Sequence, residues 1–337
     1  MILLGDCLTT LPTLPDRSVQ TCITSPPYFG LRDYGCDGQI GLEPTPREFV
    51  DTMVQVFREV RRVLREDGTL WLNLGDSYST ESKWGGSTGG KAAAGLHGAY
   101  GGGRTKARHG IPDKNLLGIP WRVAFALQAD GWYLRQDIIW SKPNPMPESV
   151  RDRCTKAHEY LFLLSKSARY YFDADAIAEP LAESSIERLS QPNLEQQRGS
   201  DRVPGKTNGT MKAVGPRFCG NKYGDDDSDQ TRTKSGNVWD GAIGKRNKRS
   251  VWTIPTQPMR EAHFATFPQA LVEPCIRAGS RPGDTVLDPF LGAGTTALVA
   301  EREGRQWIGC ELNPDYAAIA ERRLRGVQRP LVLRGAA

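Results

Sequence analysis

The chain has 337 residues, 38% of them hydrophobic, which is enough for one large domain or two modest domains with a buried core. Lys and Arg number 44 against 39 Asp and Glu, so the net charge is only +5 and any nucleic-acid surface must be a local patch. A collagen, a disulfide-rich mini-protein, a disordered tail and a membrane span of ~18 apolar residues are excluded, and we expect a soluble cytoplasmic protein.

The first 80 residues alternate between apolar runs and an amphipathic stretch. This pattern predicts strands at 2–4, 21–24 and 69–74 and a helix at 46–65. The strand–helix–strand rhythm is typical of a parallel α/β sheet. Residues 83–110 then hold ten glycines and five Lys or Arg with no acid. We expect a mobile loop there, either a flexible insertion without a binding role or a loop that closes on a polyanion.

The α/β pattern resumes at Pro120, with a helix at 121–129 and strands at 134–140 and 159–164. Residues 181–250 are rich in Gly, Asn and Gln and hold 13 Lys or Arg against 9 Asp or Glu. We interpret them as a separate, loop-rich lobe, with a solvated insertion as the alternative. Helices at 268–278, 295–303 and 314–325 and strands at 285–288 and 306–311 follow. The sequence therefore predicts an α/β fold, a doubly wound, mostly parallel sheet whose halves, 1–180 and 251–337, are interrupted by the lobe.

A glycine-rich segment, Asp288-Pro-Phe-Leu-Gly-Ala-Gly-Thr-Thr-Ala297, lies between a predicted strand and a predicted helix. Gly292 and Gly294 let the backbone turn tightly and approach a ligand, while the helix adds free N–H groups. Glu311 ends the next strand, where an acid can accept hydrogen bonds from ribose hydroxyls. Together these features predict a pocket for an adenosine-containing cofactor.

The second candidate site is Ser25-Pro26-Pro27-Tyr28, at the end of a short apolar strand. Two prolines fix the backbone and remove two donors, so the segment presents carbonyl acceptors at the sheet edge where α/β proteins bind ligands. A flat exocyclic amino group could donate to the Ser25 hydroxyl and the Pro26 carbonyl while its ring stacks on Tyr28. Alone, this segment also fits a rigid turn with a packed aromatic ring.

Both segments, in this order along the chain, resemble the amino-methylating DNA methyltransferases that use S-adenosylmethionine, in their circularly permuted form. The resemblance extends through residues 5–6, 72–78, 138–144, 249–252, 263–268 and 309–316. It implies a Rossmann-like methyltransferase fold with a catalytic half at 1–180, a target-recognition lobe at 181–250 and a cofactor-binding half at 251–337. It also implies double-stranded DNA as the partner and a role in restriction–modification or in phage or host DNA protection, with a cognate restriction endonuclease as a functional partner.

The resemblance assigns the site residues one by one. Catalysis falls to Ser25, Pro26, Pro27 and Tyr28. The cofactor-binding residues are Asp6, Phe264, Thr266, Phe267, Asp288, Phe290, Gly292, Gly294, Thr295 and Glu311. Lys142, Arg151 and Arg153 are candidates for phosphate contacts, with an ordinary solvated face as the alternative. Asp76 is either a cofactor or substrate residue or a helix cap, and we expect no metal.

The implied chemistry is methyl transfer to an exocyclic amino group of an extruded base. Adenine-methylating relatives usually carry Asp or Asn at the position of Ser25, and serine is commoner in the N4-cytosine branch. We therefore expect N4-methylcytosine in duplex DNA, with N6-methyladenine as the alternative. Other acceptors are RNA and protein glutamine, which relatives with a Pro-Pro-Tyr segment methylate.

Other classes of protein explain the sequence less well. An NAD-dependent oxidoreductase would use the same glycines but leave the Ser25–Tyr28 segment unexplained, and a catalytically inactive DNA-binding module would not need two intact sites. A C5-cytosine enzyme needs a cysteine nucleophile. Cys275 follows a proline, but its apolar neighbours indicate a core position. We also expect Trp140 and Trp252 to be packing residues.

Overall fold

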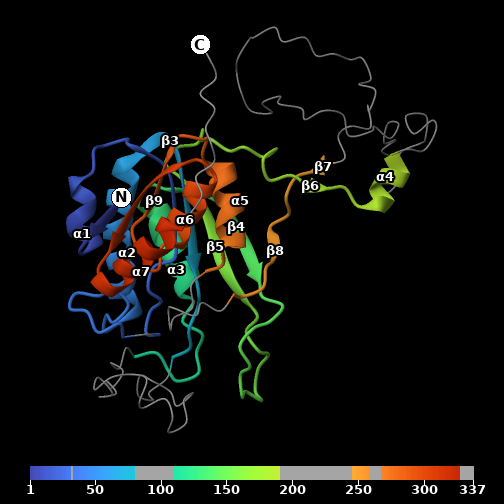
Figure 1. Cartoon of the computed structure of the whole chain (residues 1–337). Coiled ribbons are helices and arrows are strands. Elements are labelled where there is room, and N and C mark those ends of the chain that lie inside the picture. The colour runs from blue at the N-terminus through green and yellow to red at the C-terminus, as the bar shows by residue number, and fades with distance from the viewer. Residues whose placement is uncertain (32, 80–109, 190–244, 258–266, 327–337) are drawn as a thin grey trace. The chain divides into compact units, whose positions relative to one another are not determined.

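The computed structural model describes residues 1–31, 33–79, 110–189, 245–257 and 267–326 (Figure 1). The chain divides into two compact units, Met1–Ile177 with Arg249–Ala337, and Ala178–Lys248. The expected loop at 83–110 lies outside the described residues except for Gly110, as does most of the lobe expected at 181–250. No helix within the described ranges is long and apolar enough to cross a membrane.

The first unit is built on a sheet in which the described strands follow the order β1-β10-β9-β2-β3-β5-β4-β8. All neighbouring strands are parallel except that β5 runs antiparallel to both β3 and β4. The expectation of a mostly parallel sheet is confirmed. The strands are β1 (Ile2–Leu4), β2 (Val19–Thr24), β3 (Leu64–Leu74), β4 (Tyr133–Ser141), β5 (His158–Ser165), β8 (Val251–Thr253), β9 (Thr285–Asp288) and β10 (Gln306–Glu311).

Helices cover both faces of this sheet (Figure 1). Because side chains alternate along a strand, Leu70 and Leu72 of β3 point to one face, where α1 (Cys7–Thr10), α2 (Pro46–Val63) and α3 (Ile119–Ala129) pack. Trp71 points to the other face, against α5 (Gln269–Gly279) and α6 (Thr295–Arg302). The last helix, α7 (Pro314–Arg325), packs beside α6. This is the expected doubly wound α/β fold.

The order of the strands reverses between β9 and β2, which pair in parallel through Thr21 with Val286 and Cys22 with Leu287. Chain connections therefore diverge to either side of this pair, and a crevice opens at the carboxyl ends of the two strands. The register brings the residues that follow Thr24 next to those that follow Asp288. The two candidate sites thus lie side by side, although about 260 residues separate them in sequence.

The largest difference from the predicted boundaries lies between α2 and β3. We expected the helix to run from 46 to 65 and the next strand to begin at 69, but α2 ends at Val63 and β3 begins at Leu64. A bulge separates the pairs Val19 with Leu64 and Thr21 with Thr69. The chain can turn within this bulge because Gly68 has no side chain. A Cβ at that position would lie 2.9 Å from the Arg65 carbonyl oxygen. Sequence periodicity does not reveal such a bulge.

The second unit is described only at its two ends. There β6 (Glu179–Pro180) pairs antiparallel with β7 (Lys245–Arg246), and α4 (Glu183–Leu189) follows β6. Glu179 makes ion pairs with Arg246 (3.5 Å) and Lys248 (3.3 Å). The ends of the segment 181–244 therefore meet at a short ladder.

Candidate active site

A cavity of about 1000 Å³ lies at the edge of the sheet where the parallel strands of the first unit end. Residues at or just beyond the carboxyl ends of β1, β2, β3, β4, β9 and β10 line it. Because β5 is antiparallel, it contributes its first residues, His158 and Glu159. The cavity therefore joins the glycine-rich turn and the Ser25–Tyr28 segment in one space.

The wall of the cavity that we expect to bind the cofactor, called the cofactor wall, is formed by Pro289–Ala293, Thr295, Glu311 and Asp6. A Cβ on Gly292 would find no atom nearer than the Phe290 carbonyl oxygen at 4.0 Å, so any side chain there would project into open space. Glu311 accepts the N–H of Gly292 (2.7 Å) on one oxygen and that of Asn313 (2.8 Å) on the other. Burial raises the pKa of this carboxyl above its usual value.

Five of the expected cofactor-binding residues, Asp6, Phe290, Gly292, Thr295 and Glu311, thus lie on one wall. Phe267 also lines the cavity, whereas Phe264 and Thr266 lie outside the described residues.

Asp288 and Gly294 do not line the cavity, contrary to the direct contacts that we expected. Asp288 is 1% exposed and accepts hydrogen bonds from the hydroxyls of Thr24 (2.6 Å) and Thr296 (2.7 Å). Burial raises its pKa to about 6. Gly294 has a φ of 80°, and a Cβ on it would lie 2.9 Å from the Cβ of Ala320. Both residues therefore hold the turn in place from behind: Asp288 ties β2, β9 and α6 together, and Gly294 lets α6 approach α7.

The Ser25–Tyr28 segment follows β2 and lines the opposite part of the cavity. The ring of Tyr28 packs on the backbone of Gly75 at the end of β3, where a Cβ would lie 2.4 Å from the Cε2 of the ring. The backbone of a single glycine thus leaves room for the ring. This contact fixes Tyr28 laterally and directs its hydroxyl toward β5.

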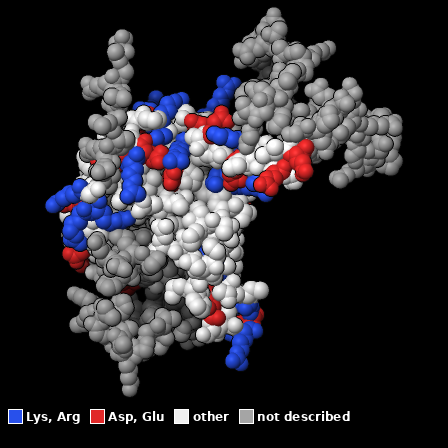
Figure 2. Space-filling view, turned by 45° about the vertical axis from the view of Figure 1, so that its right-hand side comes forward, with Lys and Arg blue, Asp and Glu red and all other residues white. Residues whose placement is uncertain are grey.

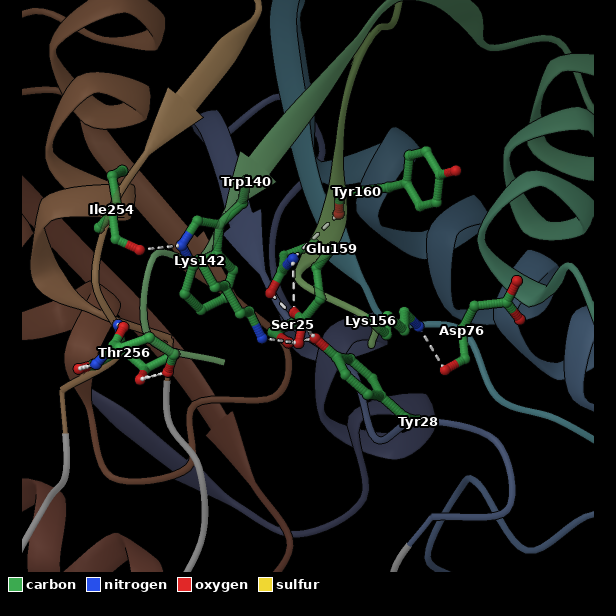
Figure 3. A network of polar contacts seen from close by, with 12 residues as sticks. Ser25, Tyr28, Asp76, Trp140, Lys142, Lys156, Glu159, Tyr160, Ile254 and Thr256 are labelled. Atoms are coloured by element: carbon green, nitrogen blue, oxygen red, sulfur yellow. Dashed lines mark hydrogen bonds and ion pairs between the residues drawn. The ribbon is translucent and has the colours of Figure 1, made fainter. Parts of the chain in front are cut away.

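Polar side chains from four strands converge on that hydroxyl (Figure 3). Tyr28 donates to Glu159 Oε2 (2.6 Å), and Ser25 Oγ donates to the Tyr28 oxygen (3.4 Å). Asn73 Nδ2 lies 3.3 Å from the same Glu159 oxygen, and Lys142 forms an ion pair with the other. Burial, and then the charge of Glu159, raise the pKa of Tyr28 well above its usual value, which keeps the phenol protonated.

Neither Glu159 nor Asn73 was predicted as a site residue from the sequence. The sequence shows only that Glu159 lies at the start of an otherwise apolar strand and that Lys142 directly follows another strand. These two positions indicate an ion pair only if β5 is known to be antiparallel to β4, because that direction brings the start of β5 to the edge where β4 ends.

The three candidates for DNA contacts have different surroundings. Lys142, a candidate for a phosphate contact, lies in the cavity wall, paired with Glu159 and 4.2 Å above the ring of Trp140. Arg153 pairs with Glu148 and stacks on Tyr78 at 4.1 Å, whereas Arg151 is exposed. Basic and acidic side chains lie together near the lower end of the face in Figure 2, while the middle of that face is largely uncharged.

The remaining candidates have structural surroundings. Asp76 lines the cavity but also caps α3, accepting the N–H groups of Gly118 (3.1 Å) and Ile119 (3.0 Å). Cys275 is fully buried in α5, and the indole of Trp252 is buried and donates to a backbone carbonyl, so these two packing predictions are confirmed. Trp140 is also buried and donates to a backbone carbonyl, but it lines the cavity. The described residues contain no cluster of His, Cys, Asp and Glu that could hold a metal ion.

Comparisons with known proteins agree with this geometry. A family model described as DNA methylase matches residues 19–322. The chain is 42% identical to the Type II methyltransferase M.Cfr9I of Citrobacter freundii, over 96% of this chain and 86% of that protein. It is 41% identical to the Type II methyltransferase M.SmaI of Serratia marcescens, over 96% of this chain and 90% of that protein.

Two solved structures share the fold. The PvuII DNA methyltransferase, described as cytosine-N4-specific, superposes with a TM-score of 0.60 at 20% identity, covering 97% of this chain and 87% of that one. A putative DNA modification methylase from Thermus thermophilus, solved with S-adenosyl-L-methionine, superposes with a TM-score of 0.55 at 24% identity, covering 100% of this chain and 98% of that one.

Proposed function

Because the chain belongs to the family of N6- and N4-amino DNA methylases, and is a Type II restriction–modification DNA methyltransferase that uses S-adenosylmethionine, we propose that it methylates the N4 atom of cytosine in duplex DNA. The observation that carries this proposal is the shared cavity. In it, the Ser25–Tyr28 segment faces the turn Pro289–Ala293 across the switch point between β2 and β9.

The residues of the cofactor wall fit S-adenosylmethionine. Gly292 leaves open space that a Cβ would fill, and the buried carboxylate of Glu311 stands where it can accept hydrogen bonds from ribose hydroxyls. Asp6 and Phe290 complete this wall. When bound, the cofactor supplies a methyl group on a positively charged sulfur, so the chain's own task is mainly to position the acceptor.

The Ser25–Tyr28 segment activates the acceptor nitrogen. The lone pair of an exocyclic amino group is delocalised into the base, which makes that nitrogen a poor nucleophile. Hydrogen bonds from its two protons to the Ser25 hydroxyl and the Pro26 carbonyl pyramidalise the nitrogen and return electron density to it. The Tyr28 ring, held by Gly75, offers a stacking surface for an extruded base.

Cytosine is proposed as the target because serine stands at the first position of the Ser25–Tyr28 segment. The relatives that methylate adenine usually carry Asp or Asn there. The description of the PvuII enzyme as cytosine-N4-specific is in line with this choice. A hydroxyl and a carboxylate can each accept one amino hydrogen, so the alternative product, N6-methyladenine, would leave the mechanism unchanged.

Nucleoside mass spectrometry tests the proposal. Duplex DNA incubated with the purified protein and S-adenosylmethionine, then digested to nucleosides, is expected to contain N4-methylcytosine. Ser25→Ala should slow its formation without unfolding the protein, and Tyr28→Ala should weaken methyl transfer more than cofactor binding. N6-methyladenine as the sole product would refute the cytosine assignment.

We further propose that the modification protects DNA from a cognate restriction endonuclease, as the Type II relatives suggest. DNA from cells that express the active protein should resist an endonuclease of the same site, and DNA from cells that express Ser25→Ala should be cut. Equal cutting of both DNAs would contradict this role.

A further inference from the structure

The hydrogen-bond network behind the Ser25–Tyr28 segment has a direction that follows from counting protons. The phenol of Tyr28 has one proton and two acceptors within reach, Glu159 Oε2 at 2.6 Å and Asn73 Oδ1 at 3.2 Å. The shorter contact is to a charged oxygen, and charge-assisted hydrogen bonds are roughly twice as strong as neutral ones. The proton of Tyr28 therefore points to Glu159.

Because Tyr28 donates its proton to Glu159, its oxygen acts only as an acceptor toward Ser25, whose Oγ lies 3.4 Å away. The hydroxyl proton of Ser25 then turns toward Tyr28, and the lone pairs of Ser25 Oγ face away from it. Figure 3 shows the side chains of Ser25, Tyr28 and Glu159 converging at one place. An exocyclic amino group that enters the cavity would thus find an acceptor at Ser25.

We propose that Glu159 is a positioning residue which, through Tyr28, fixes the Ser25 hydroxyl as a hydrogen-bond acceptor for the target amino group. This inference rests on the proposed function of the Ser25–Tyr28 segment and adds the group that sets its polarity.

The surroundings of Glu159 suit this role. Its side chain is 14% exposed, and the ammonium of Lys142 balances its charge on Oε1, leaving Oε2 for Tyr28. Asn73 Nδ2 donates to the carbonyl of Tyr160 (3.0 Å) and lies 3.3 Å from Oε2, which holds the carboxylate on the β3 side. The carboxylate is therefore anchored on both of its oxygens, and its acceptor character toward Tyr28 is fixed.

We call the hydrogen-bonded chain from Glu159 through Tyr28 to Ser25 the relay, and the variant Glu159→Gln tests the direction of its hydrogen bonds. In this variant the ammonium of Lys142 attracts the amide oxygen, so the amide N–H turns to Tyr28 and donates to the phenol oxygen. The Tyr28 proton is then displaced toward its two remaining acceptors, Asn73 Oδ1 at 3.2 Å and Ser25 Oγ at 3.4 Å, and a proton that turns to Ser25 occupies the lone pair that the target needs. Because Asn73 takes the proton in part of the molecules, we expect kcat to fall by about threefold to tenfold, with the affinity for S-adenosylmethionine unchanged.

A second background separates this effect from general damage to the site. In Tyr28→Phe there is no phenol to reverse, so adding Glu159→Gln should lower kcat by less than about twofold. The matched control is Glu303→Gln, which removes another partly buried, ion-paired carboxylate, bound to Arg277 outside the cavity, and should leave kcat unchanged. If Glu159→Gln does not fold, the cycle of Ser25→Ala with Tyr28→Phe tests the other half of the relay. Tyr28→Phe should then lower kcat only when Ser25 is present.

The relay is overturned if Glu159→Gln keeps the wild-type kcat or lowers it equally in both backgrounds. For the second cycle, equal losses with and without Ser25 overturn it. These outcomes are distinct from a failure of the proposed function. N6-methyladenine as the wild-type product would remove the cytosine assignment but leave the cycles interpretable, because any exocyclic amino group needs the same acceptor.

Discussion

Four carboxylates in or near the cavity have different roles because their surroundings differ. Asp288 has no access to the cavity and ties strands β2 and β9 to helix α6, while Asp76 caps α3. Glu311 lies in the cofactor wall, and Glu159 holds the phenol of Tyr28. Asp288, Asp76 and Glu311 were predicted as candidate site residues because each lies at or just beyond the carboxyl end of a strand. Glu159 was not predicted, because it lies near the start of β5.

Glu311 offers a direct test of the cofactor wall. Glu311→Ala should weaken S-adenosylmethionine binding by about tenfold or more, because a charged acceptor for ribose hydroxyls is lost. Titration calorimetry measures this, with Glu303→Ala as the control outside the cavity. Binding of NAD in place of S-adenosylmethionine by the wild-type protein would contradict the assignment of the wall.

Asp288 makes stability depend on pH. Its carboxyl titrates at 3.8 when unperturbed and at about 6 in the folded chain. Between these values the folded state binds more protons than the unfolded state, so the free energy of unfolding falls as pH rises through this window. The loss is on the order of 3 kcal/mol, since one pKa unit corresponds to about 1.4 kcal/mol.

Asp288→Asn removes this titration while keeping an acceptor for Thr24. Urea unfolding at about pH 4 and about pH 7 should show the variant gaining up to about 3 kcal/mol relative to the wild type at the higher pH. A difference between the two proteins that does not vary with pH would contradict a raised pKa at this position.

At the scale of elements, the sequence predicts most strands and helices because their apolar periodicity is undisturbed. The exceptions are instructive. Leu64 begins β3 where helical spacing still continues, because pairing with Val19 outweighs the local pattern. The three-residue strand β8 is too short to show a period, and it is defined by its pairing with β4 through Trp140 and Trp252. The direction of β5 has no local signal, and the relay behind Tyr28 depends on it.

The approach of α6 to α7 can be tested with two glycines of similar backbone conformation. Gly294 has a φ of 80° and faces the Cβ of Ala320, whereas Gly283 has a φ of 86° and open space around it. Gly283→Ala should cost about 1 kcal/mol of unfolding free energy through backbone strain alone. Gly294→Ala should cost about 2–4 kcal/mol, because overpacking adds to the strain. Equal losses in urea unfolding would show that the contact with Ala320 is unimportant.

At the scale of the whole molecule, the two units suggest separate duties. We propose that the segment 181–250, together with the basic segment 83–110, supplies affinity for DNA and the choice of target sequence. The segment can be removed without disturbing its ends, because Pro180 and Lys245 lie opposite each other in the antiparallel pair of β6 and β7. Residues 181–244 can be replaced by Asn-Gly, which closes a two-residue hairpin.

The protein that lacks residues 181–244 should bind S-adenosylmethionine as the wild type does but bind DNA more weakly. The logarithm of its DNA affinity should also depend less on salt, by roughly 0.9 in slope for each phosphate group that the segment no longer neutralises. Fluorescence anisotropy at several salt concentrations measures both quantities. Unchanged DNA affinity and unchanged sequence choice would show that the segment has no part in recognition.

The pairing of β1 with β10 bears on how the protein is made. The N–H of Gly309 donates to the carbonyl of Met1 (3.0 Å), and the N–H of Gly5 to that of Glu311 (2.8 Å), so β1 pairs with a strand that is translated much later. At 5–20 residues per second, roughly 15 to 60 s of translation separates the two partners. Asp6 and Glu311, on one wall of the cofactor pocket, meet only after that interval. A nascent chain therefore carries the Ser25–Tyr28 segment throughout that interval without the means to methylate DNA, and activity begins only once β10 has been translated.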